Sequence, residues 1–295
     1  MLNLICPYTT KPVNEIDESR EHIVPDALGG PNSFALRADK SKNSLYGEGI
    51  DSRLINSDLV RLRATSSGVM TRSGPSNLSS RGELTSDGSK VDVRLNADSV
   101  DLRLRNPVVK DASTGILTGV RGFGDDAEEE LRKLQQQLLK KGRTALAGAP
   151  IAQSSEVKVR LTLDQLHIAQ GLGKIAYLMT VWTLGDGFVA TGGAASYRNW
   201  IEAAPNEGAL QASGLHMIPV GELGDSMRDL DEHHHVLTCT RQGSKVATTV
   251  RLFNSDLFNF GSVVEVPELS PLHEGLRIIV IDAKEKTFEE IDRAL

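Results

Sequence analysis

Residues 19–30, with the sequence Ser-Arg-Glu-His-Ile-Val-Pro-Asp-Ala-Leu-Gly-Gly, are the most informative stretch of this 295-residue chain. Residues 20–25 predict a short strand that ends at a proline, and the turn-forming residues of 26–32 predict a loop. Residues 34–38 predict a second strand. The stretch and its continuation therefore predict a wide hairpin.

A helix is expected after this hairpin. Asp39 is a suitable N-cap, and apolar residues follow at rough helical spacing as far as Leu62. Gly47 and Gly49 weaken the first turns of this helix. The predicted order is strand, loop, strand, helix.

Three side chains in this segment have the chemistry of a metal-dependent nuclease. Glu21 and Asp51 offer carboxylate oxygens, which suit Mg²⁺ or Mn²⁺ and leave coordination positions open for water and phosphate. His22 offers an imidazole that can accept a proton from water near neutral pH. Neighbouring strand residues point to opposite faces, so Glu21 and His22 are expected to share one site only if the strand end is distorted.

The run from Ser19 to Gly30, with Asn43 and Asp51 after it, resembles the Glu-His variant of the HNH endonuclease signature over about residues 6–62. The resemblance implies a ββα-metal fold that holds one Mg²⁺ or Mn²⁺ ion through Glu21 and Asp51. It implies that His22 is the general base and that Asn43 organises the loop around it. It also implies cleavage of nucleic acid, with DNA expected, to give 5′-phosphate and 3′-hydroxyl ends. The residues expected to contact nucleic acid are Arg20, Lys40, Lys42 and Arg53.

Many relatives frame this hairpin with two pairs of zinc-binding cysteines, and this chain departs from that pattern. Cys6 remains, but Thr9 stands where a second cysteine would, and Asp39 and Lys42 lie near the other pair. No structural zinc is expected, because a zinc site of this kind needs four nitrogen or sulfur ligands. The module is expected to be held by packing instead, through Phe34, Leu36 and Leu45 against Ile23 and the second unit.

The fold class expected for the whole chain is α+β. We expect an HNH module at 1–62, a loop or linker at 63–89 and a larger α+β domain at 90–295. The alternating residues of 90–95 and 100–104 predict a hairpin, and strands are also expected at 156–163, 236–240, 246–253 and 276–281. Helices are expected at 125–143, 164–184 and 196–204.

Composition limits the other classes of function. The formal net charge is −6, and residues 1–124 hold 16 basic against 15 acidic side chains, while 125–295 hold 17 against 24. A polyanion partner is therefore expected at the N-terminal part. The absence of a long apolar run and of a secretory start predicts a cytoplasmic protein without membrane contact, and the two distant cysteines argue against a disulfide. A homo-oligomer is left open.

Several other features have ordinary interpretations. The run 233–235 of three histidines is expected to start a strand, because alternating strand residues cannot all reach one ion. The glycines of 171–174 lack the pattern of a phosphate loop, and His167 and His216 are expected to be core histidines. The arginines of 90–105 suit either a solvated strand face or a surface that follows a nucleic-acid backbone. The alternative to a nuclease is a degenerate HNH scaffold that binds nucleic acid or regulates without catalysis.

Overall fold

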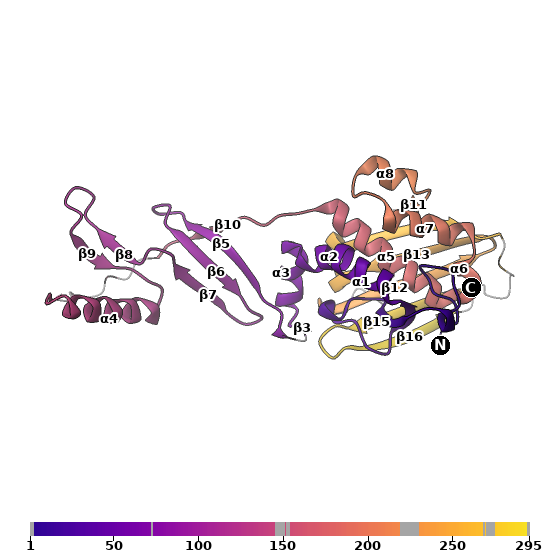
Figure 1. The fold of residues 1–295 in the computed structure, drawn as a ribbon, viewed down its shortest axis with the longest axis horizontal. Coiled ribbons are helices and arrows are strands. Elements are labelled where there is room, and N and C mark those ends of the chain that lie inside the picture. Colours follow the sequence, from indigo (N-terminus) through magenta and orange to yellow (C-terminus); the bar gives the residue numbers. More distant parts are fainter. Residues whose placement is uncertain are drawn as a thin grey trace. The chain divides into compact units, whose positions relative to one another are not determined.

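The computed structural model describes residues 3–71, 73–144, 151, 154–218, 230–267, 269 and 275–293. The chain belongs to the mixed α+β class, as predicted, and divides into two compact units. Unit 1 contains residues 1–76 and 163–295, and unit 2 contains residues 77–162 (Figure 1). This differs from the predicted division, because unit 2 is inserted between two parts of one unit.

Unit 1 begins with the predicted hairpin and helix. Strands β1 (Glu18–His22) and β2 (Ala35–Asp39) pair antiparallel in regular register, from Glu18 opposite Asp39 to His22 opposite Ala35. Asp39 caps the next helix as predicted, since its side chain accepts a hydrogen bond from the backbone N–H of Lys42. The helix runs as α1 (Lys40–Tyr46), a π-helical turn (Gly47–Asp51) and α2 (Ser52–Asn56), followed by α3 (Asp58–Ser66).

The rest of unit 1 is a six-stranded sheet with helices on one face. The sheet order is β11-β14-β13-β12-β15-β16, and every neighbouring pair is antiparallel. Its strands are β11 (His216–Met217), β12 (His234–Gln242), β13 (Lys245–Arg251), β14 (Asn259–Glu265), β15 (Gly275–Asp282) and β16 (Thr287–Arg293). The helices are α5 (Gln165–Leu184), α6 (Asp186–Val189), α7 (Gly192–Glu202) and α8 (Glu207–Ala212). Strands β11, β14 and β16 were not predicted.

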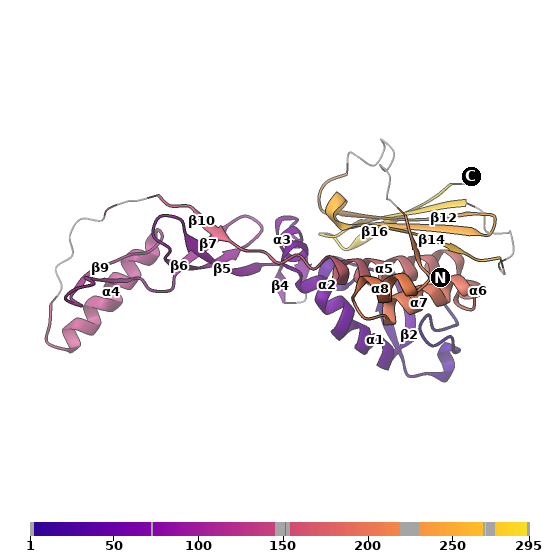
Figure 2. The ribbon, with the colours of Figure 1, turned by 90° about the horizontal axis from the view of Figure 1, so that it is seen from above.

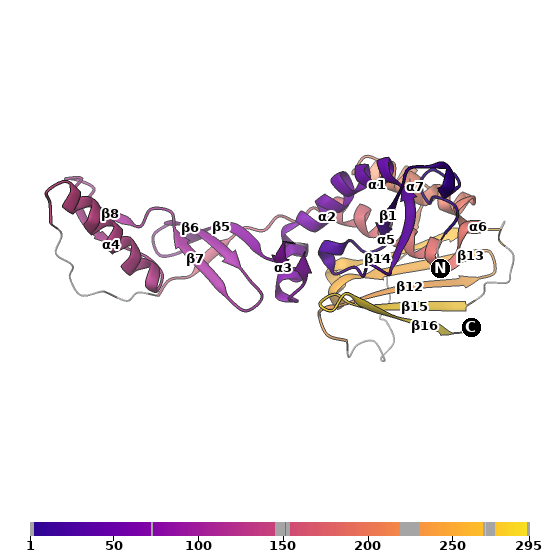
Figure 3. The ribbon, with the colours of Figure 1, turned by 60° about the horizontal axis from the view of Figure 1, so that its bottom comes forward.

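Helix α5 forms the middle layer of unit 1. Figures 2 and 3 show the sheet on one side of α5 and the β1–β2 hairpin with α1 on the other. A helix covered on both sides has no solvent face, which explains its almost continuous apolar sequence. Gly171 allows a close approach, because a Cβ there would lie 2.9 Å from Leu54 of α2. The glycines of 171–174 therefore serve helix packing.

Unit 2 contains the predicted hairpin within a small sheet. The strands β5 (Leu78–Leu84), β6 (Lys90–Leu95), β7 (Val100–Leu104) and β10 (Val157–Val159) form an antiparallel sheet in the order β10-β5-β6-β7. A second hairpin, β8 (Val108–Lys110) with β9 (Leu117–Val120), precedes helix α4 (Asp125–Lys140). The segment predicted as a linker at 63–89 instead contains the end of α3, the short pair β3 (Met70–Thr71) and β4 (Gly74–Pro75), and β5.

The arginines on the predicted hairpin of unit 2 are largely paired with acids. Arg105 forms an ion pair with Asp92 at 2.6 Å, and Arg103 lies 3.5 Å from Glu130. Exposed pairs of this kind contribute little stability, but they neutralise the charge that a nucleic acid would meet. This arrangement favours the solvated strand face over the nucleic-acid surface.

Within the described part of the chain, no helix combines the length and apolar character needed to cross a membrane. The twenty-residue helix α5 carries Lys174 at its centre.

The glycine-containing loop after β1 is held against the sheet of unit 1. Gly29 has a φ of 88°, and a Cβ at this position would lie 2.4 Å from the carbonyl oxygen of Ala283. The buried ring of His235 donates from Nε2 to the Leu28 carbonyl at 2.7 Å and accepts at Nδ1 from the N–H of Phe253 at 2.9 Å. Gly29 is thus fixed by the turn after β15, and Leu28 is fixed by the start of β12.

His235 predicts a decrease in stability in mild acid. Burial lowers the pKa of His235 from 6.5 to about 4, so the unfolded state binds more protons between these values. The stability that the neutral His235 contributes is fully present above pH 6.5 and is lost as the pH falls toward 4. We expect the free energy of unfolding to fall by about 2.5 kcal/mol between pH 7 and 4.5, at roughly 1.4 kcal/mol per unit of pKa difference.

The measurement is urea unfolding across this pH range, with His235→Gln as the comparison. The glutamine variant should be less stable at pH 7 but should lack most of this pH dependence. An unchanged slope in the variant would show that another group controls acid sensitivity.

Candidate active site

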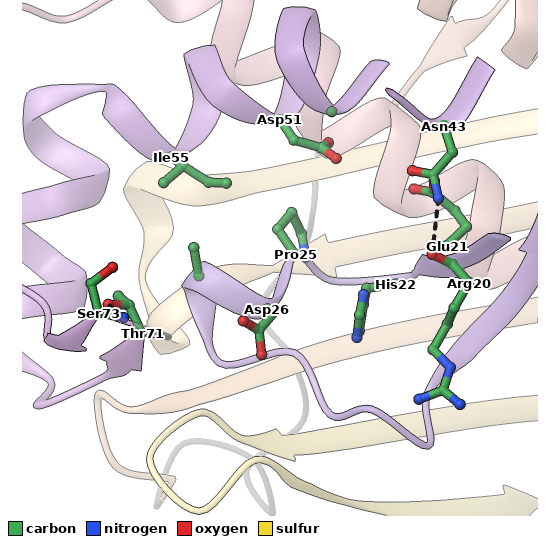
Figure 4. A pocket seen from close by; sticks show the side chains of 12 residues that line it. Arg20, Glu21, His22, Pro25, Asp26, Asn43, Asp51, Ile55, Thr71 and Ser73 are labelled. Atoms are coloured by element: carbon green, nitrogen blue, oxygen red, sulfur yellow. Dashed lines mark hydrogen bonds between the residues drawn. The ribbon is translucent and has the colours of Figure 1, made fainter. Parts of the chain in front are cut away.

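A cleft of about 450 Å³ opens beside the end of β1. It is lined by all four predicted site residues, Glu21, His22, Asn43 and Asp51. Glu21 and His22 come from β1, Asn43 from α1, and Asp51 from the end of the π-helical turn (Figure 4). The cleft is also lined by Arg20, Pro25, Asp26, Ala27, Gly47, Ile55, Thr71 and Ser73.

The π-helical turn places Asp51 on the cleft. Two residues eight positions apart in a regular α-helix lie roughly 80° apart around its axis. A turn with i→i+5 bonding holds more residues than an α-helical turn, so it reduces this offset between Asn43 and Asp51. Both side chains consequently line the cleft, although the sequence between them contains two glycines.

The two predicted metal ligands share a buried lysine. The ammonium of Lys174, on α5, lies 2.8 Å from Oε1 of Glu21 and 2.6 Å from Oδ2 of Asp51. Lys174 and Glu21 are almost fully buried, with exposed side-chain fractions of 2% each, whereas Asp51 is 16% exposed. We refer to Glu21, Asp51 and Lys174 as the ion triad.

Burial and charge act against each other in this triad. Burial opposes the charge on Lys174, but Asp51 and Glu21 outweigh it and raise the lysine pKa above its ordinary value. Burial also raises the pKa of Glu21, and the charge of Asp51 adds to this effect while Lys174 opposes it. The triad with both acids ionised has a net charge of −1, so it still attracts a cation.

The cleft side of the ion triad suits a divalent cation. Lys174 does not line the cleft, so it approaches the carboxylates from the protein interior. Among the described residues, Oε2 of Glu21 has no hydrogen bond of ordinary geometry, although the equally unpaired hydroxyl of Tyr8 lies near this carboxylate. Burial and then the charges of Glu21 and Asp51 raise the pKa of Tyr8, so its hydroxyl stays neutral. The carboxylate oxygens of Glu21, with the neutral Tyr8 hydroxyl beside them, and those of the partly exposed Asp51 are of the kind that a hard metal ion prefers.

His22 is held by an asparagine that the sequence did not suggest. Its Nε2 lies 3.0 Å from Oδ1 of Asn32, and an oxygen acceptor there requires the proton on Nε2. Nδ1 of the neutral ring is then the basic nitrogen. Strand β1 is regular at this point, so the expected distortion is absent, and Figure 4 shows His22 pointing away from Glu21. Both residues nevertheless line the cleft, because β1 ends at its edge.

Asn43 connects α1 to the strand that carries His22. Its Nδ2 donates to Oγ of Ser19 and to the carbonyl of Arg20, each at 2.9 Å. These bonds join α1 to β1 and do not contact His22. Asn32, and not Asn43, is the residue that orients the imidazole.

Of the four residues predicted to contact nucleic acid, Arg20 alone lines the cleft, where it is exposed. Lys40 pairs with Asp17 at 3.4 Å, and Lys42 pairs with Glu202 at 2.8 Å. Arg53 donates to His167, which is therefore partnered at the surface and is not a core histidine. Arg20 is the residue best placed to meet a phosphate.

The positions at which the family that the sequence resembles carries zinc cysteines lie together here. Sγ of Cys6 accepts from the backbone N–H groups of Thr9 at 3.5 Å and Asp39 at 3.2 Å. Oδ1 of Asp39 accepts from the N–H of Lys42 at 3.0 Å. Hydrogen bonds thus connect the positions that a metal joins in the resembling family.

The expected packing of the module is partly correct. Phe34, Leu36 and Ile23 are buried, and Phe34 lies 5.0 Å from both Trp182 of α5 and Phe288 of β16, measured between ring centroids. Leu45 is 59% exposed, so its predicted role in this packing is wrong. It lies on the solvent side of α1.

Comparison with known proteins provides no further constraint: no family model, no curated protein and no solved structure matches this chain.

Proposed function

We propose that this chain is an HNH-type endonuclease that hydrolyses phosphodiester bonds, with DNA as the expected substrate. The observation that carries the proposal is that Glu21, His22, Asn43 and Asp51 all line one open cleft although they come from three different elements. Acidic oxygens on one side and an imidazole on the other are the groups that phosphodiester hydrolysis requires.

Each residue has a defined part in this proposal. His22 removes a proton from the attacking water through Nδ1, while the hydrogen bond to Asn32 holds the proton on Nε2. Glu21 and Asp51 would hold one Mg²⁺ or Mn²⁺ ion, which stabilises negative charge on the phosphate and the leaving oxygen. Arg20 contacts a phosphate from the rim of the cleft, and Asn43 keeps α1 and β1 at a fixed spacing.

Lys174 is a buried counter-charge behind the acidic pair. Two carboxylates that share one buried site repel each other and favour protonation of one of them. The ammonium within 2.8 Å of Glu21 and 2.6 Å of Asp51 offsets this repulsion and allows both acids to stay close while ionised.

The same contact favours a second candidate, a non-catalytic HNH scaffold that binds nucleic acid or regulates another process. The lysine already neutralises one of the two charges that would attract a metal ion. In this alternative, the ion triad holds β1, the π-helical turn and α5 together, and no divalent cation is needed.

Plasmid nicking and calorimetry separate the two candidates. In the nuclease, nicking should require Mg²⁺ or Mn²⁺ and should fall roughly a hundredfold or more in Asp51→Asn, since a charge-stabilising group is lost. Glu48→Gln is the matched control, because Glu48 is an exposed acid in the same turn that does not line the cleft. If DNA-loaded protein shows no Mg²⁺ or Mn²⁺ binding that depends on Asp51, the scaffold is correct.

A further inference from the structure

We propose that Asp231, His233 and His234 form a binding site for Zn²⁺ or a similar transition-metal ion, separate from the cleft. One ligand atom from each residue lies within 4.8 Å of the other two. Asp231 is exposed, and both histidines are half-buried, so an ion can reach all three from solvent.

Two neighbouring histidines converge here because only one of them belongs to the strand. His233 lies in the turn before β12, and His234 is the first residue of that strand. Their rings lie 4.3 Å apart between centroids with an interplanar angle of 35°. His235 points into the core and contacts Leu28, as strand alternation requires. Three consecutive strand residues cannot all reach one ion, so His235 is excluded from the site. His233 and His234 can both belong to it.

A hydrogen-bonding group beside His234 selects one nitrogen of its ring, and both nitrogens of His233 face carboxylates. Nδ1 of His234 faces the carbonyl of Asp231 at 3.3 Å, which assigns the proton to Nδ1 and leaves Nε2 as the ligand. Nδ1 of His233 lies 4.0 Å from Oδ2 of Asp231, and Nε2 of His233 lies 3.7 Å from Oδ2 of Asp282.

Asp282 supplies the outer carboxylate that metal-binding histidines usually have. Its other oxygen, Oδ1, accepts from the backbone N–H groups of Lys284 at 2.9 Å and Glu285 at 3.0 Å, which fixes the carboxylate beside His233. A histidine that ligates a metal through one nitrogen commonly donates its other N–H to such a carboxylate, which fixes the ring and increases its basicity. Asp282 faces Nε2 of His233 at 3.7 Å and Asp231 faces Nδ1 at 4.0 Å, so either carboxylate must approach by several tenths of an ångström to accept a hydrogen bond from the ring.

The ligand set favours zinc over magnesium. Two imidazoles and one carboxylate suit Zn²⁺, Co²⁺ or Ni²⁺, whereas Mg²⁺ prefers oxygen ligands. Ligands at roughly 2.0–2.1 Å around a tetrahedral zinc ion lie about 3.3 Å apart. Rotation of the exposed Asp231 side chain and of the two half-buried rings would have to close the present spacing to that value. Water would complete the coordination.

The position of the site suggests that a metal ion there supports the fold. His234 and Asp282 are directly paired across β12 and β15. The turn that follows Asp282 carries Ala283, which contacts Gly29. It also carries Lys286, whose ammonium lies 2.7 Å from Oδ1 of Asp26. An ion that joins the start of β12 to its neighbours would stabilise the part of unit 1 that holds the glycine-containing loop.

Zinc titration of the full, tag-free, chelator-treated chain tests this inference by calorimetry. We expect about one equivalent of Zn²⁺ to bind, and a hundredfold excess over its dissociation constant should raise the unfolding midpoint by about 5 to 10 °C. The double substitution His233→Gln with His234→Gln should abolish binding, and Asp282→Asn should weaken it roughly 10- to 100-fold. Co²⁺ should give a visible absorption band in the native chain that is lost in the double variant.

Two controls make the outcome specific. His216→Ala removes an exposed histidine elsewhere and should leave zinc binding unchanged, and Asp51→Asn should also retain it, so zinc binding does not depend on nuclease activity. The metal-free unfolding midpoint of the double variant should match that of the native chain. The inference is overturned if the native chain binds no zinc, or if the folded double variant binds it equally well.

Discussion

Substitution of His22 by alanine is expected to lower the rate of metal-dependent DNA nicking by about 100- to 10,000-fold, the usual contribution of a general base. His22 contacts Asn32 at the edge of the cleft and is only half-buried, so its loss should have little effect on folding. Single-turnover nicking by the native and variant chains measures the difference directly.

A small-molecule base makes this test specific. Added imidazole should restore part of the variant's activity, because the cleft is open to solvent. His216→Ala controls for the loss of a histidine outside the cleft. Equal nicking by the native chain and His22→Ala would remove His22 from the mechanism.

Substitution of Lys174 by methionine is expected to destabilise the chain by about 3 to 5 kcal/mol, the range for breaking a buried ion pair on one side. Methionine fills much of the volume of the lysine side chain but leaves Glu21 and Asp51 close together without their counter-charge. The free energy of unfolding in urea measures the loss at neutral pH.

The pH dependence of this loss identifies its electrostatic origin. The pKa of Glu21 is already raised by burial and by the charge of Asp51, and removal of Lys174 raises it further. An acid that is more easily protonated in the folded state gains stability as the pH falls, so the difference between variant and native chain should narrow in acid.

Lys42→Met is the comparison, because Lys42 pairs with Glu202 at a solvent-exposed position and its loss should cost no more than about 1 kcal/mol. Addition of Mn²⁺ should partly restore the stability of Lys174→Met if the cleft binds a cation. A Lys174→Met chain as stable as the native one at neutral pH would contradict the assigned role of the triad.

Local sequence patterns predicted the elements that depend on local interactions. The hairpin of β6 and β7 follows from alternating residues, and α5 follows from the apolar run of 164–184. Asp39 likewise capped α1 where predicted. In each of these elements, the deciding contacts lie within a few residues along the chain.

Non-local contacts explain what the sequence did not predict. The sequence near residue 76 does not predict that the chain returns to the same unit at residue 163. This return depends on packing between distant segments. Strand β16 has charged residues along much of its length and was missed for that reason, although it pairs fully with β15.

The sequence predicted that Glu21, His22 and Asp51 come together, and they line one cleft, but it did not predict their partners. Lys174 offered one usable signal, since a lone lysine inside an apolar helix must find a counter-charge if it is buried. Nothing in the sequence indicated that this counter-charge was the proposed metal pair. Asn32 was part of the predicted loop, but its contact with His22 depends on the path of that loop.

The wide sequence separation within the ion triad also has a consequence for synthesis. A ribosome completes Glu21 and Asp51 early, but Lys174 follows 123 residues after Asp51, beyond the whole of unit 2. His235, which holds Leu28, follows Leu28 by 207 residues. The nascent chain therefore carries an acidic pair without its counter-charge until unit 2 has been synthesised, and a loop without the His235 contact for longer still. The cleft reaches its final geometry only after both parts of unit 1 have been made.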